Sequence, residues 1–308
     1  MKTVGIVGGT GFTGKYITAL LLKKGYAVVV FTRNARLKSI IPNLTYAMWD
    51  ATHRTCDTEA LKTIHVAIHL AGAGIADKRW TDERKQEILD SRVKSTEFLV
   101  NQLQLHAPFC KTFIAASAIG FYGADKHPGH PFTEEAGAYP DFLGDTCKKW
   151  EEASAEASSF LRTVILRFGI VLGKESGAFP QLAAPMNFGV MPILGSGDQI
   201  VSWIHVADIA NMVLFAIEHE TVKGIYNAVA PNPVTHKELM KTIARLKGGF
   251  KIPAPAPSFL LQIMLGELSI EVLKSCTVSA AKIEAVGFKF EFPVIETAVK
   301  AILAQKEA

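Results

Sequence analysis

Short apolar runs rich in β-branched residues alternate with longer segments of helical periodicity over the first 170 residues of the chain. Six of these runs are typical of buried strands, and they lie at residues 4–7, 26–31, 44–48, 66–70, 112–116 and 163–168. Between them, the spacing of apolar side chains predicts a long helix over residues 81–106 and another over residues 143–159. Strands that alternate with helices in this way predict an α/β fold built on a doubly wound parallel sheet of the Rossmann type.

The pattern changes after residue 170. Residues 173–197 are rich in glycine, proline and methionine, which is more typical of pocket-lining loops than of a core. Three prolines in residues 251–257 predict a break before a last segment. Further elements are expected as follows: helices near residues 202–218, 258–266 and 293–304, and a strand at residues 225–229.

These changes in sequence pattern predict that the chain is divided into two parts. We expect residues 1–170 to form the sheet domain, with residues 203–230 returning to it. Residues 171–202 and 231–308 would form a smaller α+β C-terminal lobe that holds the substrate. At 308 residues, the chain is long enough for one to two domains.

Three glycines follow the first strand directly. Gly8, Gly11 and Gly14 lie three residues apart, and an apolar-periodic segment continues to Lys24. A strand, a glycine turn and a helix in this order are what dinucleotide-binding folds require, because the glycines allow a tight turn, a close approach of the backbone to a pyrophosphate and close helix–strand packing. The N–H groups that open the helix then face the anion. The residues predicted to bind the dinucleotide here are Gly8, Thr10, Gly11, Phe12 and Thr13.

The end of the second strand indicates which dinucleotide binds. An acidic residue there binds the ribose 2′-hydroxyl of NAD, whereas a basic residue accommodates the 2′-phosphate of NADP. The chain has no acidic residue before Asp50, and Arg33, Arg36 and Lys38 follow the strand. Because an arginine can donate two parallel charge-assisted hydrogen bonds to a phosphate, we predict NADP(H) as the cofactor. Asp50, at the end of the third strand, is expected near the adenine.

The fourth strand runs into small residues from Ala71 to Gly74, which we expect to line the cofactor. His65 and His69 lie four residues apart on this strand. Since the sequence offers no third ligand nearby, we predict that both histidines pack and that the chain holds no metal.

Composition and charge exclude several classes of protein. The net charge of +4 is mild, and basic runs interleaved with aromatic residues are absent from the sequence, so a nucleic-acid partner is not expected. The sequence has no apolar stretch of about 18 residues that would predict a membrane span. The first strand begins at once, which leaves no room for a leader peptide. Because the four cysteines are scattered, the simplest expectation is a reduced cytoplasmic protein.

Taken together, these segments resemble those of a known family. The chain is similar to the extended short-chain dehydrogenase/reductase family, which includes nucleotide-sugar epimerases and dehydratases, and more narrowly to its atypical branch of epimerase family proteins. The segments that carry the broader resemblance are the glycine turn, Leu70-Ala71-Gly72, residues 117–123, Leu166-Arg167-Phe168-Gly169 and residues 203–208. The segments that carry the narrower one are Asp90-Ser91-Arg92, Trp150-Glu151, residues 195–197, 202–205 and 230–233, and a tail from about Pro253 that is similar to a domain of unknown function.

The resemblance implies further cofactor contacts. By analogy, Thr32 and Arg33 hold the 2′-phosphate of NADP(H). The residues that would line the rest of the cofactor are Leu70, Ala71, Gly72, Glu87, Arg92 and Gly144.

The usual catalytic residues of this family are missing. Short-chain dehydrogenases use a Tyr-x-x-x-Lys pair, in which the lysine lowers the pKa of the tyrosine, and a Ser or Thr that binds the reacting oxygen. Aligned on Glu151, this chain has Leu143 at the tyrosine position and Cys147 at the lysine position. Ala118 stands where the hydroxyl belongs, with Ser117 one residue early. The sequence leaves three candidates for the chemistry, namely Ser117, Tyr122 and Cys147; Tyr139, Lys148 and Lys149 lie within reach in sequence.

Two classes of function stay open. The first is an NADP(H)-dependent oxidoreductase or epimerase that acts on an unidentified small polar substrate, gripped by Gln199, Trp203 and His205. The second is a non-catalytic NADP(H)-binding protein that senses redox state. His205 and Asp208 are equally suited to cap the helix that follows them. Because the helices at residues 81–106 and 143–159 pair between subunits in many relatives, we expect a monomer or a homodimer.

Overall fold

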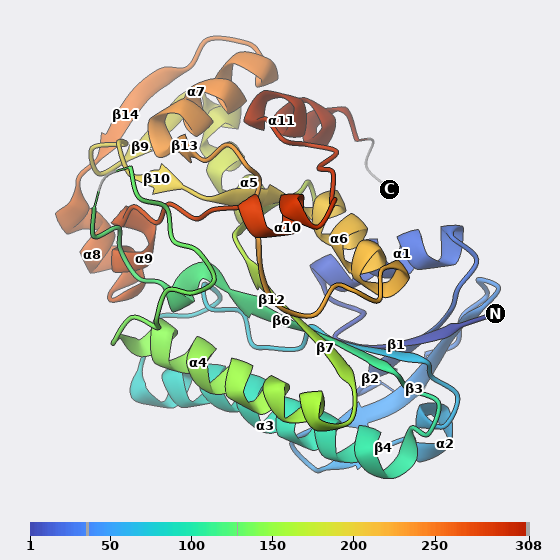
Figure 1. Cartoon of the computed structure of the whole chain (residues 1–308). Coiled ribbons are helices and arrows are strands. Elements are labelled where there is room, and N and C mark those ends of the chain that lie inside the picture. Colours follow the sequence, from blue (N-terminus) through green and yellow to red (C-terminus); the bar gives the residue numbers. More distant parts are fainter. Residues whose placement is uncertain (35–36, 128, 306–308) are drawn as a thin grey trace.

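An eight-stranded sheet forms the centre of the computed structural model, which describes residues 1–34, 37–127 and 129–305 (Figure 1). Its spatial order is β12-β7-β6-β5-β1-β2-β3-β4. The strands of this sheet are β1 (Thr3–Val7), β2 (Ala27–Thr32), β3 (Leu44–Asp50), β4 (Thr55–Cys56), β5 (Val66–His69), β6 (Thr112–Ala118), β7 (Arg162–Phe168) and β12 (Gly224–Ala228). Arg36, one of the cations predicted to follow the second strand, lies outside the described residues.

The strands of the sheet run parallel, apart from β4, which turns back antiparallel on β3. β1 is central, and its Ile6 lies between Val30 of β2 and Ile68 of β5. These strands are buried on both faces, which explains why they consist of nearly unbroken apolar runs. The strand order reverses between β1 and β5, and in open α/β sheets ligands bind at the carboxyl ends of the strands beside such a reversal. The predicted doubly wound parallel sheet is confirmed.

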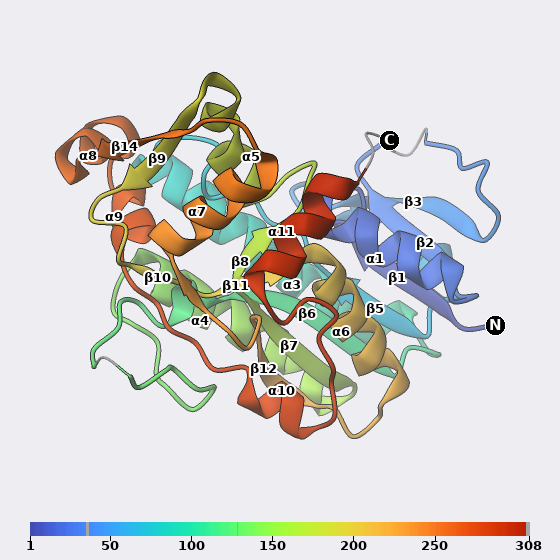
Figure 2. The same cartoon turned by 90° about the horizontal axis from the view of Figure 1, so that it is seen from above.

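Helices cover both faces of the sheet (Figures 1 and 2). On one face, α1 (Phe12–Lys23) and α6 (Val206–Glu218) pack together over an apolar cluster that includes Ile17, Ile68 and Val213. On the other face, α2 (Thr58–Leu61) and α3 (Asp82–His106) cover a second cluster around Phe98 and Phe113, and α4 (Phe142–Ala155) lies beside α3. The helix predicted to reach residue 159 is α4 followed by a 3₁₀ turn, η2 (Glu156–Ser159). A shorter 3₁₀ turn, η1 (Ile119–Phe121), follows β6.

A third apolar cluster lies beside the sheet, around Leu172, Met186, Trp203, Ile243 and Val299. The elements that build or border it are β8 (Ile170–Leu172), α5 (Ala178–Ala183), η3 (Ala184–Phe188), β9 (Val190–Leu194), β10 (Ile200–Val201), β11 (Trp203–His205), β13 (Val234–Thr235), α7 (His236–Lys247), α8 (Ser258–Leu265), α9 (Leu268–Leu273) and α11 (Ile295–Ala304). The expectation of loops over residues 173–197 is therefore wrong, because this stretch contains a helix, a 3₁₀ turn and a strand. Within the described residues, no helix has the length and apolarity to cross a membrane.

The proline-rich segment is a strand and not a break. β14 (Ile252–Ala256) pairs in parallel with β9, through hydrogen bonds from the Ile252 N–H to the Gly189 carbonyl (2.8 Å) and from the Gly195 N–H to the Ala256 carbonyl (3.0 Å). Alternate residues of a strand point their backbone groups to opposite sides. Pro253 and Pro255 thus face the open edge, where a missing N–H costs no ladder hydrogen bond.

Part of the C-terminal segment packs on the sheet domain. Residues Cys276, Val278, Ile283 and Phe288 join the first cluster under α6, and α10 (Ala281–Ala285) lies beside β12. These residues pack against the sheet domain, whereas buried side chains of α7 and α11 belong to the third cluster.

The start of α6 differs from the helix predicted from Ser202. β11 pairs with β8 up to His205, and the His205 Nδ1 accepts a hydrogen bond from the Ala207 N–H (3.2 Å) as the helix N-cap. Asp208 does not cap the helix. Its carboxylate accepts hydrogen bonds from the N–H groups of Glu291 (2.8 Å) and Phe292 (3.0 Å), and so fixes the C-terminal segment to α6.

The buried cap makes stability depend on pH. Burial lowers the pKa of His205 to about 4, so the unfolded chain takes up a proton that the folded chain excludes. The free energy of unfolding should therefore fall as the pH drops from 6.5 towards 4. The variant His205→Asn keeps a capping acceptor but does not titrate. Urea unfolding at pH 7 and at pH 5 should show that the free energy of unfolding decreases between these pH values by about 2 kcal/mol less in this variant than in the wild type. His219→Asn, at an exposed histidine, should leave the loss unchanged.

Candidate functional site

The glycine turn brings the end of β1, the start of α1 and the end of β5 into direct contact. Gly8 has a φ of +86°, and a Cβ atom there would lie 2.8 Å from the Ala71 nitrogen. A Cβ atom on Gly14 would lie 2.6 Å from the Gly9 Cα. Neither site has room for a side chain, so both glycines are required by the close approach of three backbone segments.

The backbone at the start of α1 is open to a ligand. Gly11 is the N-cap, it provides no side-chain cap, and the first turn of α1 contains no acidic residue. The N–H groups around Phe12 and Thr13 therefore lack the usual side-chain acceptor, and Thr10 lies in the turn before them. A helix N-terminus of this kind at the carboxyl edge of a sheet fits a phosphate group. The Phe12 ring packs against residues 173–177, with its Cε1 3.2 Å from a Cβ placed on Gly177.

The end of β2 is basic. Arg33 is exposed directly after the strand, and the Thr32 hydroxyl accepts a hydrogen bond from the Asn34 N–H (3.3 Å). Asp50 is engaged by its own turn, since its carboxylate bonds to His53 Nδ1 (2.9 Å) and accepts from the Thr52 N–H (2.9 Å). The hydrogen bond from His53 holds the pKa of Asp50 below its usual range. Its carboxylate thus closes the turn between β3 and β4.

Helix α3 fixes the segment that follows β5. After Leu70 and Ala71 the chain reaches Gly72, where a Cβ atom would lie 3.1 Å from the Arg92 guanidinium carbon. Arg92 donates to the carbonyls of Ala73 and Ile88 at 3.0 Å each, and its guanidinium lies 5.3 Å from the centroid of the Trp150 ring. This cation therefore lies between α3, α4 and the end of β5.

Arg84 was not found by sequence reasoning. It is buried at the start of α3, donates to the Gly74 carbonyl and pairs with Glu87 at 2.6 Å. This ion pair lowers the pKa of Glu87, whose carboxylate is otherwise exposed. The spacing of the two residues, i and i+3 at a helix start, is the only signal for the pair in the sequence.

The positions of the missing catalytic pair are apolar. Leu143 packs against Gly120 and Cys147 is buried, and both lie on α4. Burial raises the pKa of the Cys147 thiol to about 12, with the carboxylate of Glu151 adding to the shift. Gly144, predicted to line the cofactor, donates its N–H to the Asp141 carboxylate (2.8 Å), and the Tyr139 carbonyl occupies the space that a Cβ would need. Cys147 therefore keeps its proton near neutral pH and provides no thiolate base.

Ser117 and Tyr122 belong to one buried polar network. Arg167 donates from Nε and Nη2 to the two carboxylate oxygens of Glu151, at 2.7 Å each. The Ser117 hydroxyl donates to the same carboxylate (2.6 Å). Arg167 Nη1 donates to the Tyr122 hydroxyl (2.8 Å), which donates in turn to the Asn227 side chain (2.6 Å). We call these five residues the Arg167 network.

This network changes the interpretation of two catalytic candidates. Burial raises the pKa of Tyr122 to about 12, and its hydroxyl is already bonded on both sides. Burial disfavours the charge on Arg167, but the Glu151 carboxylate outweighs it and raises the pKa of the guanidinium. Tyr122 and Ser117 therefore satisfy a buried ion pair. The structure gives them a structural role that their place in the sequence did not reveal.

Other predicted substrate contacts also bond to their own chain. The Gln199 side chain donates to the Leu194 carbonyl (3.0 Å), and the buried Trp203 donates to the Asn232 carbonyl (3.0 Å).

His69 bonds to the Ser95 hydroxyl (2.9 Å), while His65 Nδ1 accepts from the Thr3 N–H (3.2 Å). Across residues 1–34, 37–127 and 129–305, no group of three His, Cys, Asp or Glu side chains is placed to hold a metal ion.

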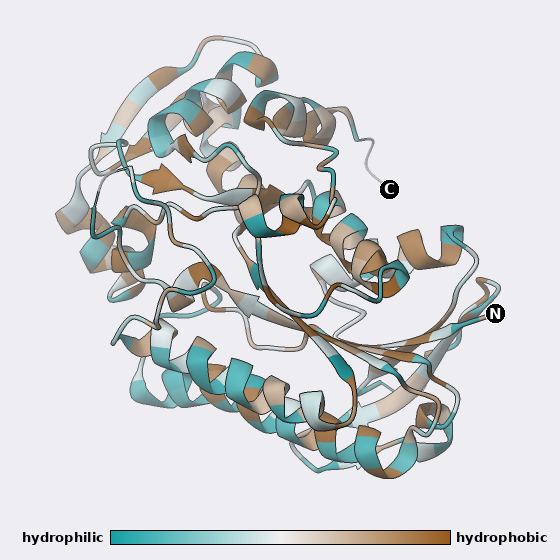
Figure 3. Ribbon diagram, viewed as in Figure 1, coloured by the Kyte–Doolittle hydropathy of each residue, from teal (hydrophilic) through white to brown (hydrophobic). Residues whose placement is uncertain are grey.

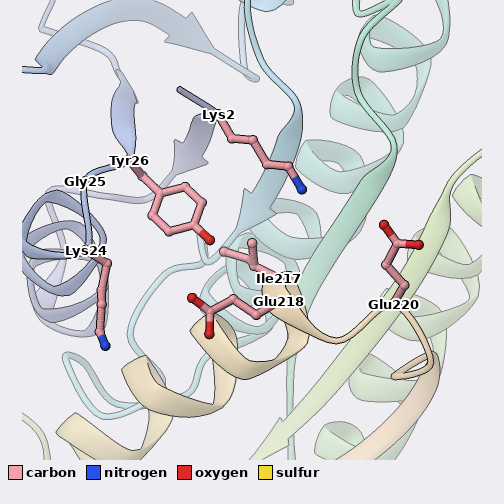
Figure 4. Close-up of a pocket in the computed structure, with 7 residues that line it drawn as sticks. All are labelled: Lys2, Lys24, Gly25, Tyr26, Ile217, Glu218 and Glu220. Atoms are coloured by element: carbon pink, nitrogen blue, oxygen red, sulfur yellow. The ribbon is translucent and has the colours of Figure 1, made fainter.

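A pocket of about 410 Å³ lies at the opposite end of the sheet (Figure 4). Its lining residues are Lys2, Lys24, Gly25, Tyr26, Ile217, Glu218 and Glu220. They come from the start of β1, the end of α1 and the end of α6, so the pocket is at the amino ends of the strands. Because the glycine turn is at the carboxyl ends, this pocket is separate from the candidate site.

The Arg167 network should contribute strongly to stability. Glu151→Ala would leave a buried guanidinium without its counter-ion, so we expect urea unfolding to show a loss of about 3–5 kcal/mol. Glu152→Ala is a matched control, because Glu152 is exposed and 3.9 Å from Lys148; its loss should stay below about 0.5 kcal/mol. Equal losses in the two variants would contradict the structural role of the network.

Comparisons with known proteins agree with this geometry. A family described as "NAD dependent epimerase/dehydratase family" matches residues 4–228, and "Domain of unknown function (DUF1731)" matches residues 256–302. The chain is 37% identical over 306 residues to epimerase family protein YfhF of Bacillus subtilis (strain 168), a match that covers 99% of each protein. It is 29% identical over 306 residues to the chloroplastic epimerase family protein SDR39U1 homolog of Arabidopsis thaliana, covering 98% of this chain and 86% of that one.

A crystal structure of human epimerase family protein SDR39U1 (isoform2) with NADPH superposes with a TM-score of 0.84 at 27% identity, covering 97% of this chain and 98% of that one. The resemblance noted in the sequence is confirmed, because two family descriptions and full-length relatives agree with it. The chain belongs to the NAD dependent epimerase/dehydratase family.

Proposed function

We propose that this chain binds NADP(H) and uses it as an oxidoreductase or epimerase of the extended short-chain dehydrogenase type, acting on a small polar substrate. The observation that carries the proposal is the packing of Gly8 against the backbone of Ala71, next to an uncapped α1 N-terminus and the exposed Arg33. The similarity to human SDR39U1, whose crystal structure is described with NADPH, supports it.

Each part of the cofactor would meet a different segment. The pyrophosphate would lie on the backbone of Gly8, Thr10, Gly11, Phe12 and Thr13 at the start of α1. The 2′-phosphate would bind Thr32 and Arg33, since there is no carboxylate at the end of β2 to bind a free 2′-hydroxyl. Asp50 would border the adenine. The nicotinamide half would be lined by Leu70, Ala71, Gly72, Glu87, Arg92 and Gly144.

Arg92 would supply the positive charge that the missing lysine supplies in relatives. Cys147 stands at the lysine position on α4, and the charge of Arg92 from α3 partly offsets the rise that burial causes in the pKa of this thiol. Burial lowers the pKa of Arg92, but an arginine remains protonated at neutral pH. A cation beside Gly72 would stabilise a negatively polarised group at the nicotinamide end of the crevice. Gly74, Arg84 and Glu87 would hold this part of the wall in place.

The proton would come from solvent or from the substrate. A bound nicotinamide supplies a hydride or accepts one. Leu143 has no exchangeable proton, and Cys147 and Tyr122 both have pKa values of about 12. The Ser117 hydroxyl is bonded to the Glu151 carboxylate. None of these side chains would then take part in proton transfer, and water would exchange the proton.

A non-catalytic NADP(H)-binding sensor is the second candidate function. The observation that favours it is the replacement of the tyrosine and the lysine by the buried Leu143 and Cys147. In such a protein, the cofactor would change the contacts of the segments around it, with no chemical step.

Cofactor preference tests the charge argument. Reversing the charge in Arg33→Asp should weaken NADPH roughly 100-fold, because the 2′-phosphate loses a charge-assisted pair and meets a carboxylate. NADH, which has no 2′-phosphate, should change less than about threefold. Titration of the purified protein, followed by nicotinamide fluorescence, measures both constants.

Lys23→Asp provides a control for net charge, because Lys23 is an exposed residue at the other end of α1. It should leave both affinities unchanged. If Arg33→Asp weakens the two cofactors equally, the 2′-phosphate lies elsewhere. If the wild-type protein binds neither cofactor, the glycine turn is only structural and the proposal fails.

Catalysis can be tested separately from binding. With NADPH deuterated at one face of C4, a carbonyl panel should give a stereospecifically labelled product. The rate for Cys147→Ala should remain within about twofold of the wild type, because a thiol with a pKa near 12 is protonated at pH 7. A loss of tenfold or more would give Cys147 a catalytic role. Inertness of the wild type over the whole panel, together with cofactor-dependent partner binding, would favour the sensor.

A further inference from the structure

Two phenylalanine side chains protrude into solvent beside the paired strands β9 and β14. Phe188, at the end of η3, is 87% exposed, and Phe250, in the turn before β14, is 83% exposed. Val190 and Ile252 pair across the two strands and are 36% and 58% exposed. We call these four residues the Phe188 patch. A contiguous group of exposed apolar side chains of this kind marks an interaction surface.

The patch is one continuous surface that the backbone holds in place. The Ile252 N–H donates to the Gly189 carbonyl (2.8 Å), and a Cβ on Gly189 would lie 3.7 Å from the Phe250 carbonyl oxygen. Lys251 Nζ donates to the carbonyls of Gly248 (2.9 Å) and Phe250 (3.5 Å), which closes the turn between α7 and β14. Both phenylalanines therefore lie on neighbouring turns, and β14 and α7 are at the periphery of the molecule in both views (Figures 1 and 2).

The charge around the Phe188 patch is positive. No acidic residue occurs in residues 176–197, which include η3 and β9, or in residues 239–266, which include most of α7 and all of β14. The second range carries four cations, namely Lys241, Arg245, Lys247 and Lys251. Among the residues that the structure describes, Arg245 pairs with Glu296 of α11 (3.0 Å), whereas the three lysines pair with no carboxylate.

The carboxylates of the neighbouring elements do not cancel this charge. Glu238 lies at the start of α7, more than two helical turns before Lys247, and Asp198 follows the far end of β9. Helix α11, which packs on α7, adds Lys300 besides the paired Glu296. The surface thus differs from the outer sides of α3 and α4, which are mostly hydrophilic, as the teal along both helices shows (Figure 3).

Apolar side chains and unpaired cations on one surface restrict the kind of partner. A second copy of the chain would bring the same cations to the patch and be repelled. A nucleic acid would use the rings and the lysines but would gain nothing from the aliphatic Val190 and Ile252. A membrane of anionic phospholipid uses both groups, because apolar side chains enter the boundary between head groups and acyl chains while cations meet the phosphates.

We propose that the Phe188 patch attaches the protein to the surface of an anionic phospholipid membrane. Phe188 and Phe250 enter the head-group boundary, and Lys247 and Lys251 contact the phosphates beside them. Attachment of this kind lies in the plane of the interface and needs no spanning helix. Each cation near the surface strengthens the attachment about fivefold, so the lysines and the rings contribute comparably.

Binding to vesicles tests the proposal. The 308-residue chain should sediment with vesicles of phosphatidylcholine that contain about 40% phosphatidylglycerol, and should bind pure phosphatidylcholine at least tenfold more weakly. Salt at about 0.5 M should weaken binding to the anionic vesicles, because it screens the attraction. Phe188→Ser and Phe250→Ser should each weaken binding about tenfold or more, since a large apolar side chain is lost. Lys247→Glu should weaken it at least tenfold.

Two matched variants control for exposure and net charge. Phe109, which follows α3, is 60% exposed, and Phe109→Ser should bind as the wild type does. Lys223 is exposed before β12, and Lys223→Glu changes the net charge as much as Lys247→Glu but should leave binding unchanged. Circular dichroism and the urea midpoint of all these variants should equal those of the wild type, because the substituted side chains are exposed.

Four results would overturn the proposal. The first is a wild type that does not bind the anionic vesicles. The second is binding that Phe109→Ser weakens as much as Phe188→Ser does. The third is equally tight binding of a single-stranded oligonucleotide, lost in Phe188→Ser and Lys247→Glu, which would assign the patch to a nucleic acid. The fourth is a wild-type mass of twice 33.5 kDa that Phe188→Ser halves, which would assign the patch to a second copy of the chain.

Discussion

The buried ion pair between Arg167 and Glu151 is the constraint on which the arrangement around the site depends. Removing two charges from water costs several kcal/mol each, and the cost is offset only when the geometry is good and every remaining polar atom has a partner. Here the pair is bidentate, Ser117 donates to the carboxylate, and the Tyr122 hydroxyl accepts from the guanidinium and donates a hydrogen bond to the Asn227 side chain. Because these residues come from β6, β7, β12, α4 and the turn after η1, the network fixes all of these segments at once.

That constraint determines what α4 can present to the crevice. Glu151 lies one helical turn after Cys147 and two turns after Leu143, so anchoring Glu151 to Arg167 sets which side of α4 faces β6. At the two positions of α4 that align with the family's tyrosine and lysine, the chain carries an aliphatic side chain and a buried thiol. In the proposed function, the positive charge would come from Arg92 on the neighbouring helix, so that a charge would be kept in space while its position in the sequence changes.

The parts of this structure that the sequence predicted well are those determined locally. β1, β2 and β5 are nearly unbroken apolar runs, and the glycine turn is specified by three glycines at intervals of three residues. The elements between residues 170 and 202 are short, and their apolar side chains are buried only by distant helices such as α7 and α11. β14 was read as a break because proline disfavours strands in general, and only its pairing with β9 shows that both inner prolines face an open edge. The hydrogen bonds that Asp208 accepts from residues 291 and 292 join positions more than 80 apart in the sequence, so no local pattern predicts them.

The contrast between local and long-range signals also distinguishes the cofactor half of the candidate site from its substrate half. A dinucleotide is bound largely by backbone N–H groups and by glycines that permit close approach, so a short motif carries most of the information. A substrate is recognised by side chains that several segments bring together. In this chain the polar side chains expected for that role, Gln199, Trp203 and His205, are used by the fold itself. If the proposed function holds, substrate recognition would rest on backbone and apolar groups at the carboxyl ends of the strands and on the charge of Arg92, which would favour a substrate whose reacting group becomes negatively polarised.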